Sequence, residues 1–247
     1  MLHSTKGIVF HSLKYSESSV IVKIYTELFG IQSYLFKGVR NSKSKTKPAL
    51  FQPLTLLDLV VYHREKHSIQ SVKEIRLAHP YQTIPFDIRK SSIALFINEL
   101  VYRAIREEES NPDLFVFLWQ TFLFLDETKE NVSCFHLYFS IRLMNYLGIF
   151  PRNNHSAQLP VFNMREGFFQ ISIPDHPHYI DPLNSEIFAD MLRASEEFLS
   201  ESQNSVSRIP HPASRIRLLD IILVYYRLHL PGFRELKSHH ILHDVLS

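Results

Sequence analysis

The sequence is poor in cysteine and glycine, with one cysteine, Cys134, and six glycines among 247 residues. A single cysteine excludes an intramolecular disulfide and fits a reducing compartment. Few glycine-built phosphate loops are possible, and the sequence has no Walker loop, HExxH motif or paired-carboxylate motif. The sequence therefore predicts a protein that is not an enzyme and needs no cofactor.

Long apolar runs are also missing. The strongest run, Leu114 to Leu125, is interrupted by Trp119-Gln120-Thr121 and falls short of the roughly 20 residues that span a bilayer. The first residues lack the charged start and long apolar stretch of a signal peptide. We expect a soluble cytoplasmic protein with no membrane partner.

Charge is divided unevenly along the chain, although the formal net charge is only +2. Residues 1–80 hold 12 Lys and Arg against 5 Asp and Glu, a net charge of +7, which leaves a net charge of −5 for residues 81–247. A basic front and an acidic back indicate that the two parts meet different partners.

The front part has the pattern of short strands. Alternating apolar residues predict five strands within residues 1–80, with no helix between them that is long enough for a βαβ crossover. The predicted strands are 7–13, 19–26, 31–37, 54–63 and 69–77. Five short strands of this spacing predict a small closed barrel, for which the OB-fold is the commonest architecture.

Residues 81–247 are predicted to form a helical domain, so that the fold class is α+β. The expected helices are 87–108 with Asp87 as N-cap, one that starts at Asn111-Pro112, 131–147, 185–200, 213–230 and 238–246. Residues 149–183 break the pattern with five prolines and are expected to form an irregular excursion with a short β-hairpin.

The segment between the third and fourth strands carries a cluster of cations. They are Lys37, Arg40, Lys43, Lys45 and Lys47, and no acidic residue lies between the first and the last. A loop of this kind does not fit a hydrophobic core, but it can bind the phosphate backbone of a nucleic acid. Because nothing in it can read base edges, we expect DNA binding that is independent of sequence.

Neighbouring residues extend this candidate DNA-binding site. Tyr34 lies on a strand beside the basic loop, where its ring either stacks on bases or belongs to the barrel core. Arg64 and Lys66 lie in a polar hairpin end between the fourth and fifth strands and are a second candidate contact.

An ordered set of residues runs along the chain: Tyr15-x-Glu17-x-Ser19, Thr26, Gly30, Lys37-Gly38-x-Arg40, Ser44-Lys45, Gln52-Pro53 and Phe233-Arg-Glu-Leu-Lys237-Ser238 with Leu242. Through this set the chain resembles the RecO family of bacterial DNA repair proteins. The resemblance implies an N-terminal OB-fold in residues 1–80, a helical domain in residues 81–247, and a non-catalytic role in recombinational repair.

The resemblance also implies the partners. Members of the family bind single- and double-stranded DNA, anneal complementary strands, contact the C-terminal tail of single-strand binding protein and act with RecR. With RecR they help RecA to replace that protein on DNA, and RecF is an indirect partner. The expected location is the nucleoid. A tail-binding site needs an apolar pocket rimmed by a cation, for which the candidates are Arg103, Arg106, Arg142, Arg215, Arg217 and Arg227.

The sequence departs from the family pattern in the excursion. Many members carry a four-cysteine zinc site there, whereas residues 149–183 contain no cysteine. A tetrahedral structural site needs four thiolate or imidazole ligands, so we expect no metal. Our hypothesis is that packing of Phe162, Phe168 and Ile171 replaces the zinc.

Two other readings remain open. An OB-fold adaptor could bind another protein or RNA without annealing activity. A metal-dependent or nucleophilic enzyme has less support, because the motifs of such enzymes are missing. Tyr15-Ser-Glu17-Ser-Ser19 has no histidine or lysine partner at interpretable spacing and is better explained as a turn. Cys134 lies in an apolar helix, which is typical of a small buried hydrophobic residue.

Overall fold

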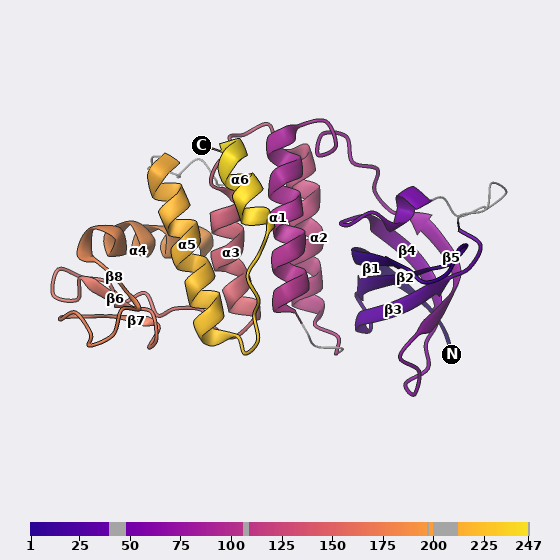
Figure 1. The fold of residues 1–247 in the computed structure, drawn as a ribbon, viewed down its shortest axis with the longest axis horizontal. Helices are drawn as coiled ribbons and strands as arrows, with labels where there is room; N and C mark the ends of the chain where they lie inside the picture. The colour runs from indigo at the N-terminus through magenta and orange to yellow at the C-terminus, as the bar shows by residue number, and fades with distance from the viewer. Residues whose placement is uncertain (40–47, 106–108, 197, 200–211, 247) are drawn as a thin grey trace. The chain divides into compact units, whose positions relative to one another are not determined.

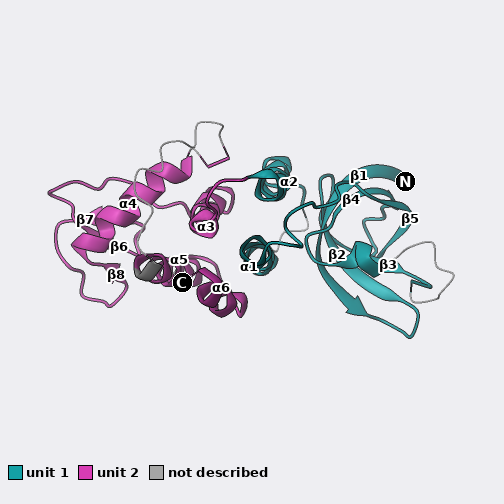
Figure 2. Cartoon of the chain, turned by 90° about the horizontal axis from the view of Figure 1, so that it is seen from above, with its two compact units in different colours: residues 1–128 teal, residues 129–247 magenta. Residues whose placement is uncertain are grey.

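The structure, a computed structural model, describes residues 1–39, 48–105, 109–196, 198–199 and 212–246 of the chain. The chain divides into two compact units, Met1–Thr128 and Lys129–Ser247. The first unit contains a β-barrel and two helices, and the second contains helices and a small sheet (Figures 1 and 2).

The predicted five-stranded barrel is confirmed. Its strands are β1 (Leu2–Lys14), β2 (Val20–Thr26), β3 (Gly30–Phe36), β4 (Leu56–Tyr62) and β5 (Gln70–Leu77), with the 3₁₀-helix η1 (Pro48–Phe51) before β4. They close in the order β1-β2-β3-β5-β4, and every pairing is antiparallel except that between β3 and β5. This closed Greek-key arrangement is that of an OB-fold.

The first strand is longer than the sequence predicted. It begins at Leu2 instead of Gly7, because Leu2 to Ile8 pair along β4 from Tyr62 to Leu56. The polar run from His3 to Lys6 hides this pairing, since backbone hydrogen bonds to a neighbouring strand leave no hydrophobic signal in the sequence.

The barrel core is made of alternating apolar side chains from all five strands and η1. Its buried members are Val9, Val22, Ile24, Tyr34, Phe36, Val39, Phe51, Leu57, Leu59 and Val61. Gly7 allows β1 to approach this core closely, because a Cβ atom there would lie 2.6 Å from Ile24 Cγ2 and 2.9 Å from Leu59 Cδ1.

Two helices follow the barrel within the first unit, α1 (Ile88–Ala104) and α2 (Pro112–Glu127). The predicted caps are confirmed: the side chain of Asp87 accepts the backbone N–H of Arg89 at 2.8 Å, and that of Asn111 accepts the N–H of Leu114 at 3.0 Å. The predicted extension of the first helix to residue 108 is wrong, because Ile105 has extended backbone angles.

These helices contact the barrel through aromatic and polar groups. The ring of Tyr25 stacks on Phe10 with centroids 5.5 Å apart and lies 6.0 Å from that of Phe115 in α2. The amide of Asn98 in α1 donates to the carbonyl oxygen of Phe10 at 3.1 Å. Tyr25 is therefore buried even though it faces away from the barrel core.

The second unit contains α3 (Phe135–Tyr146), α4 (Pro182–Glu196), α5 (Pro212–His229) and α6 (Ser238–Leu246). The third helix starts four residues after the predicted Asn131, whose side chain instead accepts the N–H of Ser133 at 2.9 Å in a turn. Gly148 ends this helix as predicted, with a φ of 69°. None of the helices in the described ranges is both long and apolar enough to cross a bilayer.

The excursion between α3 and α4 forms a three-stranded sheet. The predicted hairpin is present as β6 (Val161–Asn163) and β7 (Phe168–Gln170), and β8 (Tyr179–Ile180) adds a third strand on the other edge of β6. Two residues are too few to show a period-2 pattern, which is why the sequence did not reveal β8.

The hypothesis about the packing of the excursion is wrong for two of its three residues. Phe162 is fully buried, but Phe168 is 37% exposed and Ile171 is 74% exposed. The ring of Phe162 packs instead on Phe169 and Phe188, with centroids 4.8 and 4.9 Å away. Phe168 and Phe169 are adjacent on β7, so their side chains point to opposite faces and only one of them can face the core.

Candidate nucleic-acid interface

The strand pairings determine at which end of the barrel each connecting segment lies. The β1–β2 ladder ends at Lys14 and Val20, and the β2–β3 ladder ends at Val20 and Phe36. The parallel β3–β5 ladder places Gln70 beside Tyr34. The β1–β2 turn and the segment after β3 therefore lie at one end of the barrel. The β4–β5 turn lies at the other end, since Tyr62 pairs with Leu2 and the ring of His63 stacks on that of Phe29 between β2 and β3. In OB-folds, the β1–β2 and β4–β5 loops and the β2–β3 face commonly hold oligonucleotides.

Three of the predicted cations lie in the described residues, one directly after β3 and two in the β4–β5 turn. Lys37, Arg64 and Lys66 are exposed, and among the described residues no carboxylate lies within ion-pair distance of them. Gly38, next to Lys37, has a φ of 71°, a conformation that favours glycine. The other predicted cations, Arg40, Lys43, Lys45 and Lys47, lie outside the described residues.

Other cations of the barrel are compensated. On β5, Lys73 Nζ lies 4.0 Å and the Arg76 guanidinium 3.7 Å from the carboxylate of Glu74. A phosphate that approaches these two residues meets a neighbouring negative charge, whereas one that approaches Arg64 or Lys66 meets no such pair. The cations available to an anion therefore lie in the β4–β5 turn and after β3 rather than on β5.

The proposed stacking role of Tyr34 does not fit the structure. Its side chain is 0% exposed and belongs to the barrel core, and burial raises its pKa above the usual range. Tyr34 and Phe36 alternate with the outward Leu35, so both aromatic side chains point inward. A base cannot reach the ring of Tyr34.

Two exposed residues at the β1–β2 turn were not predicted as DNA contacts, although the sequence did predict a turn that begins at Tyr15. Lys14 is exposed at the end of β1, and the following Tyr15 is 63% exposed. The turn is fixed by the backbone N–H of Tyr15, which donates to the carbonyl oxygen of Ser19 at 3.0 Å, and by the Ser16 hydroxyl, which accepts the N–H of Ser19 at 3.2 Å. The adjacent pair of a cation and an aromatic residue, Lys14 and Tyr15, directly before a turn could have indicated a DNA contact in the sequence.

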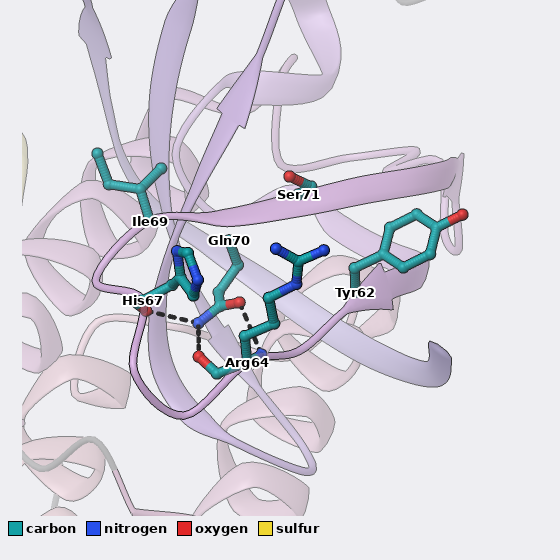
Figure 3. A pocket seen from close by; sticks show the side chains of 6 residues that line it. All are labelled: Tyr62, Arg64, His67, Ile69, Gln70 and Ser71. Atoms are coloured by element: carbon teal, nitrogen blue, oxygen red, sulfur yellow. Dashed lines mark hydrogen bonds between the residues drawn. The ribbon is translucent and has the colours of Figure 1, made fainter. Parts of the chain in front are cut away.

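The β4–β5 turn contains a pocket of about 300 Å³. It is lined by Tyr62, Arg64, His67, Ile69, Gln70 and Ser71 (Figure 3). The buried amide of Gln70 holds the turn: its Nε2 donates to the carbonyl oxygens of Arg64 and His67 at 2.9 and 2.6 Å, and its Oε1 accepts the N–H of Arg64 at 3.0 Å. The backbone beneath the pocket is therefore ordered without a ligand.

Neither a metal centre nor a reactive thiol is found in the described ranges. They contain no group of three or more His, Cys, Asp or Glu side chains arranged to hold a metal ion. Cys134 is buried, and burial raises the pKa of its thiol to about 11, although Arg215 acts in the opposite direction. The histidine of the excursion nearest the expected zinc position, His155, packs edge-on against Phe169 with centroids 5.1 Å apart.

The arginine candidates of the helices have different surroundings. Arg103 lies 3.6 Å from Glu99, and Arg217 lies 2.8 Å from Asp181. The guanidinium of Arg215 donates to the carbonyl oxygen of Leu246 at 2.8 Å beside a small pocket of about 30 Å³ among α3, α5 and α6. Arg106 lies outside the described residues, and Arg142 and Arg227 stay untested as candidates.

Comparisons with known proteins agree on one family. The family models "Recombination protein O N terminal" and "Recombination protein O C terminal" match residues 1–81 and 85–240. The chain is 39% identical over 248 residues to a protein of Bacteroides fragilis named DNA repair protein RecO, with all of both chains covered. It is 36% identical to proteins of the same name from Phocaeicola vulgatus, again over both whole chains, and from Flavobacterium johnsoniae, over 98% of each chain.

The family models and the compact units divide the chain at different places. The models meet between residues 81 and 85, beside the predicted domain boundary after residue 80. The compact units divide after Thr128, because α1 and α2 contact the barrel. The boundary after residue 80 stays a prediction.

Proposed function

Since this chain belongs to the RecO family of DNA repair and recombination proteins, we propose that it is a mediator that binds DNA without regard to sequence and anneals complementary strands. It binds single- and double-stranded DNA through the barrel surface that runs from the segment after β3 to the β4–β5 turn. In the cell it acts in the cytoplasm on the nucleoid and helps to load RecA onto DNA that is covered by single-strand binding protein.

The observation that carries this proposal is the set of exposed, uncompensated cations that follow β3 and lie in the β4–β5 turn. Lys37, Arg64 and Lys66 have no carboxylate within ion-pair distance among the described residues, and residues 1–80 carry a net charge of +7. Phosphates attract such a surface through counterion release, which does not depend on sequence. When the cations of the protein neutralise the phosphates of two DNA strands, the strands repel each other less and their bases stay free to pair.

The mediator acts without catalysis. Annealing needs no bond to be made or broken, and the residues of the proposed interface are cations, aromatic residues and a hydroxyl rather than a nucleophile with a base. The helical part would supply the protein contacts, with RecR and the C-terminal tail of single-strand binding protein as partners and RecF acting indirectly. Arg215, beside an apolar pocket, fits the chemistry of an acidic tail that ends in apolar residues.

The test is a titration of labelled DNA at several salt concentrations, followed by an annealing assay. We expect a log–log salt slope near −3 for a single strand if about four cations meet phosphates. Arg64→Gln with Lys66→Gln should make the slope shallower by about 1.4 and slow annealing, since each lost phosphate contact contributes about 0.7.

The matched control replaces the same number of charges elsewhere on the barrel. Lys73→Gln with Arg76→Gln removes two cations that already pair with Glu74, so the slope should change little. Equal effects of the two double variants would mean that only net charge matters. If the wild-type protein bound neither single- nor double-stranded DNA at low salt, the proposed function would be refuted and a protein-interaction adaptor would be favoured.

A further inference from the structure

The pocket of the β4–β5 turn has features that the charge of the barrel does not explain. Its lining combines an aromatic ring, Tyr62, that is 42% exposed, a cation, Arg64, and a hydroxyl, Ser71. In Figure 3 the guanidinium of Arg64 lies between the ring of Tyr62 and the imidazole of His67, and points toward Ser71. Electrostatic attraction to the phosphate backbone of DNA requires neither the ring of Tyr62 nor a pocket.

We propose that this pocket receives one unpaired nucleotide of a single strand, with the base against the ring of Tyr62 and its phosphate against the guanidinium of Arg64. The inference rests on the proposed function and assigns to this pocket the preference for single strands. Ser71 adds a neutral hydrogen bond to a phosphate or sugar oxygen.

The size of the pocket suits this ligand. A volume of about 300 Å³ is at the lower limit of ordinary small-molecule pockets. A pocket of that size accommodates one nucleotide and not a base pair. Its position also fits, because Gln70 pairs with Tyr34 of β3, three residues before the basic segment begins at Lys37. A strand that runs from Lys37 along β3 therefore passes Gln70 and Ser71 of the pocket.

The pocket is formed before a ligand arrives. The amide of Gln70 makes three hydrogen bonds to the backbone of Arg64 and His67, and the N–H of His67 donates to the carbonyl oxygen of Arg64 at 3.0 Å. A pre-ordered turn reduces the entropy lost on binding. The same bonds occupy the amide, the group best suited to read a base edge, so stacking on any of the four bases is expected.

A paired base cannot use this pocket. In a duplex, both faces of a base are covered by its neighbours, and exposing one face to Tyr62 would require the base to leave the stack at a cost in free energy. Phosphate contacts with Arg64 and Lys66 remain open to both kinds of DNA. The ring of Tyr62 should therefore affect single strands alone, whereas the cations should affect single and double strands alike.

The experiment compares three variants of the full-length protein on a single-stranded oligonucleotide and on its duplex. Tyr62→Leu keeps an apolar side chain on β4 but removes the ring, and should lower single-strand affinity about tenfold while leaving duplex affinity and both salt slopes unchanged. Tyr62→Phe is the matched control and should bind both DNAs as the wild type does. Arg64→Gln should weaken both and make the single-strand slope shallower by about 0.7.

A second measurement does not depend on the stability of a variant. Oligonucleotides that contain 2-aminopurine lose fluorescence when that base stacks on an aromatic ring, so the wild-type protein should quench a single strand and Tyr62→Leu should restore the signal. Absence of quenching by the wild type, or equal losses for single and double strands in Tyr62→Leu, would overturn the inference while leaving DNA binding intact. A wild type that binds no DNA would refute the proposed function together with this inference.

Discussion

The carboxylate of Asp126, near the end of α2, accepts the backbone N–H of Thr83 at 2.8 Å, 43 residues earlier in the chain. It also accepts the N–H groups of Gln82 and Ile84 and lies 3.3 Å from the ring of His79. One buried side chain thus fixes the linker between the barrel and α1. Buried charge is tolerated here because every direction around the carboxylate offers a donor.

Replacing Asp126 by Asn should destabilise the first unit by about 2–3 kcal/mol. An amide keeps one acceptor oxygen but brings an NH₂ group toward backbone N–H donors, which leaves buried donors unsatisfied. Equilibrium denaturation of the two proteins would measure the difference. Asp175→Asn is the control, since Asp175 is exposed and should change stability by less than about 0.5 kcal/mol. Equal stability of Asp126→Asn and the wild type would contradict this account of the linker.

The same residue predicts a dependence of stability on acid. Burial alone would raise the pKa of Asp126, but the N–H donors of Gln82, Ile84 and Thr83, together with His79, lower it from 3.8 to about 2. A depressed pKa in the folded state gives stability that is present above pH 4 and is lost as the pH falls from about 4 to about 2. The contribution is about 2 kcal/mol. Denaturant midpoints measured between pH 6 and pH 2 should converge for the wild type and Asp126→Asn, and a constant gap would argue against this pKa.

Gly7→Ala should destabilise the barrel by about 1–3 kcal/mol, because the new methyl group would lie within 3 Å of the buried Ile24 and Leu59 side chains. Thermal unfolding would show the loss. Gly148→Asn is a useful comparison: the position has a φ of 69° but open space around it, and asparagine tolerates that backbone conformation. If Gly7→Ala proved no more costly than Gly148→Asn, close packing of β1 would not be the reason for this glycine.

The excursion should depend on Phe162 and not on Ile171. Phe162→Ala removes a buried ring that contacts Phe169 and Phe188, at a cost of about 3–5 kcal/mol, whereas Ile171→Ala should cost almost nothing because that side chain is 74% exposed. A chelator should leave the unfolding temperature of the wild type unchanged. Stoichiometric zinc in the purified protein would refute the idea that packing replaces the metal.

Cys134 should react with a thiol reagent only when the protein opens. Its side chain is 5% exposed and burial raises the pKa of its thiol to about 11, so the thiolate is scarce at neutral pH. Ellman's reagent should modify the native protein at least about tenfold more slowly than the denatured one. Equal rates would show that the surroundings of Cys134 exchange freely with solvent.

Periodicity and capping residues in the sequence predicted most of the secondary structure. Alternation of apolar residues located all five barrel strands, and Asp87 and Asn111 marked the starts of α1 and α2. These features are local, because a side chain that caps a helix or faces a core does so through residues close to it in sequence. Charge distribution likewise located the basic part of the chain without any structure.

Burial and the meeting of distant turns depended on the tertiary structure. Closure of the barrel turned Tyr34 inward, away from any base, and brought Lys14 and Tyr15 to the end that carries Lys37, opposite to Arg64 and Lys66. The local sequence does not show whether a barrel tyrosine is buried, because helices cover part of the outer face of the barrel. Tyr25 is an example: its side chain faces away from the barrel core but is buried against Phe115 of α2. The sequence by itself determined which elements form and which charges they carry, whereas long-range strand pairing decided which side chains face solvent together, since that pairing joins residues far apart along the chain.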